Sequence, residues 1–280
     1  SNYIIETKNL TKQYGSQKSV ADLNIHVKRG RIYGLLGRNG AGKTTTMKMM
    51  LGLTKPTSGE VKIWGKSLQG NEKKLLPRIG SLIESPGFYP NLTGTENLRI
   101  FATLRGVPNN HAIKDALDLV GLPYKDKKLF SQYSLGMKQR LAIALAVMHD
   151  PELLILDEPI TGLDPMAIQD FYSMIRKLNR EDKVAIIMVS HDLRNAVEEA
   201  NKILHLQKQV LFYGPAHDYM NSKAAGHFFH EKEQGECLPT AACHMAKNVD
   251  GLENNEQKCS CGHTHAHSSQ KIEGGNTHAD

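Results

Sequence analysis

Hydrophobic residues change their spacing along the chain, and the spacing predicts different elements in different segments. From residue 23 to residue 27, apolar and polar residues alternate, which is typical of a half-buried antiparallel strand. Residues 32–36, 153–156 and 184–189 form short, unbroken apolar runs. Runs of this kind suit strands that are buried on both faces of a largely parallel sheet.

Helical spacing separates these predicted strands. It occurs at residues 44–51 and 165–178, where Pro165 suits the first turn of a helix. Between about residues 84 and 150 the patterns are mostly helical, at residues 93–104, 111–120 and 135–148. We therefore expect an α/β fold with a mostly parallel sheet, an antiparallel β-subdomain and an inserted α-helical subdomain at about residues 84–150.

The end of the chain differs in composition. After about Gly226 the periodicity gives way to Gly, Asn, Gln, His and Glu, which is typical of a flexible segment. We expect one domain at residues 1–226 and a flexible, Cys/His-rich tail at residues 227–280. All four cysteines lie in this tail, so the domain has no disulfide and suits a reducing cytosol.

Charge and hydropathy limit the classes of protein to which the chain can belong. The formal net charge is +6, with about −4 from residue 231 onward and about +10 before it. The basic residues are scattered without aromatic partners, which does not favour a nucleic-acid-binding surface. The longest apolar run, residues 141–148, is too short to span a membrane, and no signal-peptide pattern opens the chain. We expect a soluble, cytoplasmic protein that reaches a membrane through partners.

A phosphate-binding motif follows the apolar run at residues 32–36. The pattern G-x-x-x-x-G-K-[ST] is that of the P-loop, whose backbone N–H groups surround phosphate oxygens at a helix N-terminus. Lys43 is expected to reach the β- and γ-phosphates, and the Thr44 hydroxyl to bind Mg²⁺. With Thr45, the expected ATP-binding set is Gly37, Arg38, Asn39, Gly40, Ala41, Gly42, Lys43 and Thr44. The core is thus predicted to be that of a P-loop NTPase.

Two carboxylates end the apolar run at residues 153–156. In open α/β sheets, ligands bind at the carboxyl ends of the strands, so Asp157 and Glu158 are expected beside the P-loop. We expect Asp157 to lie near Mg²⁺ and Glu158 to act as the general base toward the attacking water.

Further motifs in this order resemble the ATP-binding subunits of ABC transporters over about residues 3–220. Ser134 and Gly136 stand where that family has its signature sequence, although Tyr133, Leu135 and Met137 depart from it. The resemblance implies that Ser134 and Gly136 contact the γ-phosphate held by an opposite subunit.

The resemblance assigns roles to three more places. Tyr14 matches the aromatic residue that stacks on adenine in the family. Residues 161–164 resemble the loop that couples two ATP sites across a dimer. His191 resembles the histidine that contacts the γ-phosphate, and with Glu158 and Lys43 it completes the predicted catalytic set.

Glu84 is a departure from the family pattern. The family usually has a glutamine at the junction between the sheet domain and the helical subdomain, where it senses Mg²⁺. The glutamate, together with residues 133–140, resembles the bacitracin and lantibiotic exporter branch. We expect Glu84 to contribute to the metal site with Thr44 and Asp157, although its charge changes the usual neutral sensing.

From about Ile160 onward, residues 186–192 and 211–214 resemble ATPases of zinc and manganese importers. The tail contains Cys259, Cys261, His263, His265 and His267, which are ligand types that suit Zn²⁺. Alternatives stay open here: a solvated tail that binds no metal, and a chain that combines two branches.

The resemblance implies an ATPase that powers a membrane transporter. ATP would be held between two head-to-tail copies, and polytopic membrane subunits would hold the protein on the inner face of the cell membrane. A zinc or manganese transport ATPase and a soluble ABC-type ATPase without a membrane partner are alternatives. The sequence does not determine the cargo or the direction of transport.

Overall fold

A computed structural model describes residues 2–107, 110–190 and 193–229, and the structural statements below concern these residues. They belong to one unit, Ser1–Glu231. A six-stranded sheet forms its centre, in the order β11-β10-β4-β9-β8-β7, and all neighbouring strands are parallel except β10 and β11. The strands are β4 (Ile32–Leu36), β7 (Ile79–Leu82), β8 (Leu153–Asp157), β9 (Ala185–Val189), β10 (Lys202–Gln207) and β11 (Gln209–Pro215).

The apolar runs of the sequence form the centre of this sheet. Every residue of β4 and β9 is buried, as are residues 153–156 of β8. Alternate side chains enter two separate cores: Leu154 and Leu156 pack on one face of the sheet, and Leu153 and Ile155 pack on the other. The prediction of a mostly parallel sheet with two covered faces is therefore confirmed.

A second sheet is antiparallel and covers one face of the first. Its order is β2-β1-β5-β6, with β3 also paired to β1. The helix α1 (Lys43–Met50) shares its core with both sheets through Met47, Met49 and Met50. The strands are β1 (Tyr3–Tyr14), β2 (Gln17–Leu23), β3 (His26–Lys28), β5 (Ser58–Ile63) and β6 (Lys66–Ser67).

The alternating segment at residues 23–27 is not one strand, and in this respect the prediction is wrong. Its three apolar residues are buried, but β2 ends at Leu23 and β3 begins at His26. The buried side chain of Thr7 fills the gap: its Oγ1 donates to Leu23 O (2.8 Å) and accepts from Ile25 N (3.1 Å). A side chain satisfies the backbone groups there, so the alternation continues through a break in the ladder.

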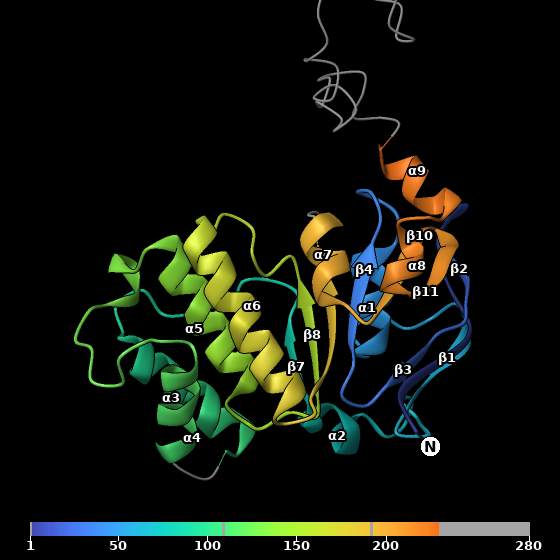
Figure 1. The fold of residues 1–280 in the computed structure, drawn as a ribbon. Coiled ribbons are helices and arrows are strands. Elements are labelled where there is room, and N and C mark those ends of the chain that lie inside the picture. The colour runs from blue at the N-terminus through green and yellow to red at the C-terminus, as the bar shows by residue number, and fades with distance from the viewer. Residues whose placement is uncertain (1, 108–109, 191–192, 230–280) are drawn as a thin grey trace, which may run out of the picture. The chain divides into compact units, whose positions relative to one another are not determined.

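Helices cover the other face of the parallel sheet (Figure 1). The long ones are α3 (Gly94–Arg105), α4 (Asn110–Leu119), α5 (Leu135–Val147) and α6 (Pro165–Arg180). Thr93 and Glu96 form a capping box at the start of α3, which fixes where this helix begins. The shorter helices are α2 (Glu72–Leu75), η1 (Leu76–Arg78), η2 (Phe130–Gln132), α7 (Leu193–Glu199), α8 (Ala216–Tyr219) and α9 (Lys223–Phe229).

Helices occupy most of the segment predicted as an inserted subdomain, since α3, α4 and α5 lie between residues 94 and 147. The exact limits at 84–150 and at 226 stay predictions. None of the helices in the described part of the chain has the length and apolar character that crossing a membrane requires.

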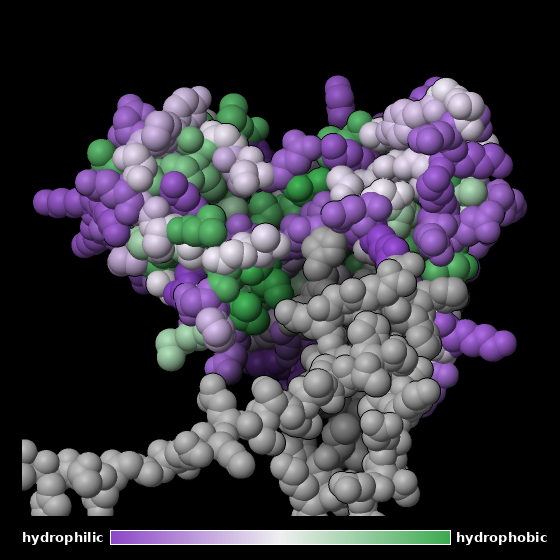
Figure 2. All heavy atoms as spheres, turned by 90° about the horizontal axis from the view of Figure 1, so that it is seen from above, coloured by the Kyte–Doolittle hydropathy of each residue, from purple (hydrophilic) through white to green (hydrophobic). Residues whose placement is uncertain are grey.

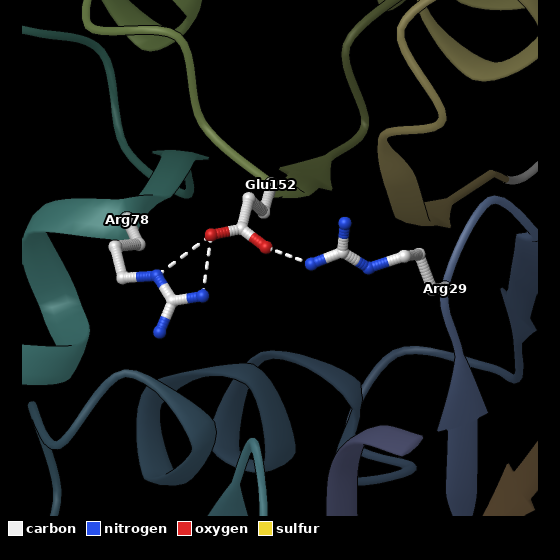
Figure 3. Close-up of polar contacts among 3 residues, drawn as sticks. All are labelled: Arg29, Arg78 and Glu152. Atoms are coloured by element: carbon white, nitrogen blue, oxygen red, sulfur yellow. Dashed lines mark hydrogen bonds and ion pairs between the residues drawn. The ribbon is translucent and has the colours of Figure 1, made fainter. Parts of the chain in front are cut away.

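A charged cluster joins the two sheets at the end opposite to the P-loop (Figure 3). Glu152 precedes β8 and its carboxylate binds Arg29, from the turn before β4, and Arg78, from the end of η1. The Arg78 Nε–Glu152 Oε1 distance is 2.7 Å, and the Arg78 guanidinium lies 3.7 Å from the centre of the Trp64 ring. One carboxylate therefore links three segments that are distant in sequence.

We predict that Glu152→Gln lowers the free energy of unfolding by about 1 kcal/mol, because two partly exposed ion pairs lose their charge. Urea unfolding followed by circular dichroism measures this change, and the loss should shrink in high salt. Glu60→Gln is the matched control, since the Glu60 carboxylate pairs with Lys62 on its own strand (3.2 Å). An equal loss in both variants would contradict a linking role for Glu152.

Candidate nucleotide-binding site

Glycines set the path of the P-loop between β4 and α1. Gly37, Gly40 and Gly42 have φ values of +144°, +79° and +98°, which side-chain-bearing residues rarely adopt. A Cβ on Gly37 would lie 2.5 Å from Leu206 O, and one on Gly42 would lie 2.5 Å from Ser19 O. A Cβ on Gly40 would meet no atom within 4 Å. The loop is therefore packed at both ends and open at its middle, where a ligand can approach its backbone.

Neighbouring elements hold this loop in place. Ala41 O accepts a hydrogen bond from Lys208 N (2.9 Å), and Lys208 O accepts one from Ala21 N (2.7 Å). The hydroxyls of Ser19 and Thr45 lie 3.1 Å apart. Both sheets thus contribute to the position of the loop.

Lys43 is a buried cation at the start of α1. Its side chain is 6% exposed, and its Nζ donates to Gly37 O (2.7 Å) and Arg38 O (3.1 Å). Burial lowers the pKa of Lys43, whereas the charges of Glu158 and Asp157 raise it. The loop carbonyls and the two acids therefore hold the positive charge of Lys43 inside the loop.

The carboxyl end of β8 reaches the P-loop as predicted. Thr44 Oγ1 donates to Asp157 Oδ2 at 3.0 Å. A hydroxyl and a carboxylate at this distance are oxygen ligands of the type that Mg²⁺ takes beside nucleotide phosphates. Glu158 follows with φ of +48°, so the backbone turns sharply directly after the strand.

Glu84 forms an ion pair with Lys48, a residue that the sequence did not single out. Lys48 Nζ and Glu84 Oε1 are 2.8 Å apart. The hydrogen bond and the charge of Lys48 lower the pKa of Glu84. The spacing could have indicated this residue, because Lys48 lies one helical turn beyond Thr44 on the same face of α1. A role of Glu84 in metal binding stays a prediction.

The other predicted residues lie in different places. Tyr14 ends β1, is 55% exposed and has Lys12 Nζ 4.9 Å from its ring centre. Ser134 is the N-cap of α5, and its Oγ accepts from Met137 N (3.2 Å). His191 and the five tail ligands predicted for Zn²⁺ lie outside the described residues. Within the described residues, no group of three or more His, Cys, Asp and Glu side chains is arranged to hold a metal ion.

The start of α5 packs against the loop after Glu158. A Cβ on Gly162 would lie 2.5 Å from Leu135 Cδ2, and a Cβ on Gly136 would lie 3.8 Å from Leu163 Cδ2. Tyr133, which departs from the family signature, is buried, and its hydroxyl occupies the space where Gly94 would carry a Cβ. The fold thus places Ser134 and Gly136 beside residues 161–164, whereas the contacts of Lys43 are with the P-loop.

Figure 2 looks onto the face at which the parallel strands end. Polar residues cover most of its described part, and apolar patches occur on the side of the helices. Leu135 and Met166, in the first turns of α5 and α6, are 58% and 74% exposed. Large apolar side chains therefore remain uncovered near Ser134.

The model of the family described as "ABC transporter" matches residues 20–161. The chain belongs to this family. Two relatives are bacitracin transport ATP-binding proteins: one from Enterococcus faecalis is 55% identical over 201 residues, and one from Bacillus licheniformis is 56% identical over 190 residues. These matches cover 72% and 68% of the chain, but only 65% and 62% of the relatives' own lengths.

Further relatives agree with the family assignment. A lantibiotic transport ATP-binding protein from Streptococcus pyogenes is 40% identical over 195 residues, which cover 70% of this chain and 82% of the relative. Among solved structures, cbiO1 from Clostridium perfringens has a TM-score of 0.72 and 25% identity, covering 80% of this chain and 93% of that one. A dimeric post-hydrolysis state of the cassette MJ0796 with ADP and Pi has a TM-score of 0.68 and 25% identity, covering 76% and 98%. The predicted fold and family are therefore confirmed.

The relatives bear on the two-branch hypothesis. A match of 201 residues is longer than either part of the chain on the two sides of Ile160, so the bacitracin transport relative is similar across this point. This favours one branch for most of the domain. The names of these relatives give no support to Zn²⁺ binding, which stays a prediction for the tail.

We predict that Gly42→Ala lowers the free energy of unfolding by about 2–5 kcal/mol, because strain at a positive φ adds to a backbone clash. Gly40→Ala is the matched control and should cost only about 1–2 kcal/mol, since its Cβ has open space. Denaturant unfolding without nucleotide measures both. Equal costs would contradict the packing of the loop against β2.

Proposed function

We propose that the chain is the ATP-hydrolysing subunit of a membrane transporter. The arrangement of Lys43, Thr44 and Asp157 at the ends of β4 and β8 carries this proposal. It combines a buried cation with oxygen ligands beside a loop that is open to a phosphate group. Family membership supports the same function.

Each residue of the nucleotide-binding site has a separate chemical role. The P-loop, residues 37–44 with Thr45, binds the phosphates, and Lys43 neutralises the charge that develops on the transferred phosphoryl group. Thr44 and Asp157 would hold Mg²⁺, which would neutralise charge on the phosphate oxygens. Glu158 accepts a proton from the attacking water, and Tyr14 stacks on adenine.

A complete site requires a second copy of the chain. Ser134 and Gly136 lie at the start of α5 with an exposed Leu135. Ser134 Oγ accepts from Met137 N, and Leu163 is the residue of another segment nearest to a Cβ on Gly136. We propose that they face the γ-phosphate bound by the partner copy. The helix N-terminus favours this anion, and the apolar residues near it become buried between the copies.

The names of the relatives support a proposal for the partners and the cargo. Bacitracin and lantibiotic transport ATP-binding proteins are among the relatives, so we propose export of a peptide antibiotic through separate polytopic membrane subunits. The chain would then lie on the cytoplasmic face of the cell membrane, bound to these subunits.

We predict that Glu158→Gln leaves ATP binding unchanged and lowers turnover by at least about 10²-fold, the lower range for loss of a general base. Phosphate release measures turnover, and calorimetry measures binding. Glu181→Gln, at an exposed position, is the control and should be unchanged. Wild-type turnover in the Glu158→Gln protein would exclude Glu158 as the general base.

We predict that Ser134→Arg prevents ATP-driven dimerisation but not ATP binding to the same copy, because the large side chain blocks the approach of the partner's phosphate. Sedimentation in the slow Glu158→Gln background shows the oligomeric state. Thr103→Arg on α3 is the control of similar charge and should dimerise. A stable dimer of the wild type without nucleotide would count against the scheme.

A further inference from the structure

Three acidic residues lie at or just beyond the carboxyl ends of two neighbouring strands of the parallel sheet. Leu82 of β7 pairs with Leu156 of β8. Glu84 and Glu158 each lie two residues beyond this pair, and Asp157 lies one residue beyond it. Neighbouring strands are about 4.8 Å apart. Each of these carboxylates adds negative charge at the edge of the sheet where the phosphates of ATP would bind.

Helix α1 provides the compensating contacts from a single face. Thr44 and Lys48 are four residues apart, which is about one turn or 6 Å along the helix. Thr44 binds Asp157 at 3.0 Å, and Lys48 binds Glu84 at 2.8 Å. The two contacts therefore connect successive turns of the P-loop helix to the ends of β8 and β7.

Lys48 and Glu84 neutralise each other's charge, and both side chains remain accessible to water. The hydrogen bond to Glu84 raises the pKa of Lys48, and the charges of Glu84 and Asp157 also raise it. The side chains of Lys48 and Glu84 are 34% and 76% exposed, so water screens their attraction. Because water reaches this ion pair, the pair can open, so Lys48 restrains the Glu84 carboxylate without locking it in one position.

We propose that Lys48 is a positioning residue for Glu84, which it holds and neutralises so that a glutamate at this place is compatible with ATP binding. A glutamine at the same place carries no charge and needs no counter-ion, whereas a free carboxylate adds a negative charge beside the phosphates. This inference rests on the proposed function, since it concerns the affinity of the same site for ATP.

The test is a double-mutant cycle with Lys48→Met, Glu84→Gln and the variant that carries both changes. The probe is the non-hydrolysable analogue AMP-PNP with Mg²⁺, measured by calorimetry. We expect Lys48→Met alone to weaken binding about fivefold, the order of magnitude for one uncompensated, water-exposed charge at the edge of the site. In the Glu84→Gln background the same change should alter binding by less than about twofold.

Equal weakening in both backgrounds would mean that Lys48 attracts the nucleotide directly, and it would overturn the proposal. No weakening in either background would overturn it as well. Lys48→Arg keeps the charge and should retain the wild-type affinity. If the wild-type protein itself fails to bind AMP-PNP, the proposed function fails, and this outcome is distinct from the other two.

Two further readouts separate positioning from a general structural effect. In steady-state ATP hydrolysis, Lys48→Met should raise KM and leave kcat within about twofold, because the repulsion acts equally on ground state and transition state. In unfolding experiments without nucleotide, the cycle should show a coupling of about two- to fivefold in the unfolding equilibrium constant. Additive effects in that cycle would show that the pair does not form and would overturn the proposal.

Discussion

The turn from β4 into α1 is the constraint on which the rest of the site depends. Gly37 and Gly42 leave no room for a side chain, because Leu206 O and Ser19 O each lie 2.5 Å from where a Cβ would be. This close packing aims α1 between the two sheets, where its methionines fill a common core. The helix in turn carries Lys43, Thr44 and Lys48, so tight glycine packing determines where these three side chains lie.

Charge balance is the second organising feature of the molecule. The two ends of the parallel sheet use it in different ways. At the carboxyl ends, Lys48 of α1 pairs with Glu84, two residues beyond β7, and the charges of Glu158 and Asp157 raise the pKa of the buried Lys43. At the amino ends, Glu152 binds Arg29 and Arg78 and joins segments from different layers. The first arrangement lies beside the P-loop, and the second links segments of the fold that are distant in sequence.

Most of the fold and much of the site could be predicted from the sequence. Unbroken apolar runs identified the buried strands β4, β8 and β9, because only strands covered on both faces can be apolar throughout. The alternating pattern wrongly predicted a single strand at residues 23–27, because the period of side-chain burial does not reveal which group forms hydrogen bonds with the backbone. There the hydroxyl of Thr7, distant in sequence, replaces the strand ladder.

The sequence by itself determined the local chemistry: the P-loop from its glycines and Lys43, the acids at a strand end, and the family from the order of its motifs. Only the tertiary structure decided which charges meet. Lys48 and Glu84 are 36 residues apart, and Arg29 and Glu152 are 123 residues apart. A sequence does not distinguish the lysines and glutamates that form ion pairs from those that do not, because ion pairing depends on distances of a few ångströms in space. Those distances are set by strand register and helix packing, which no local pattern contains.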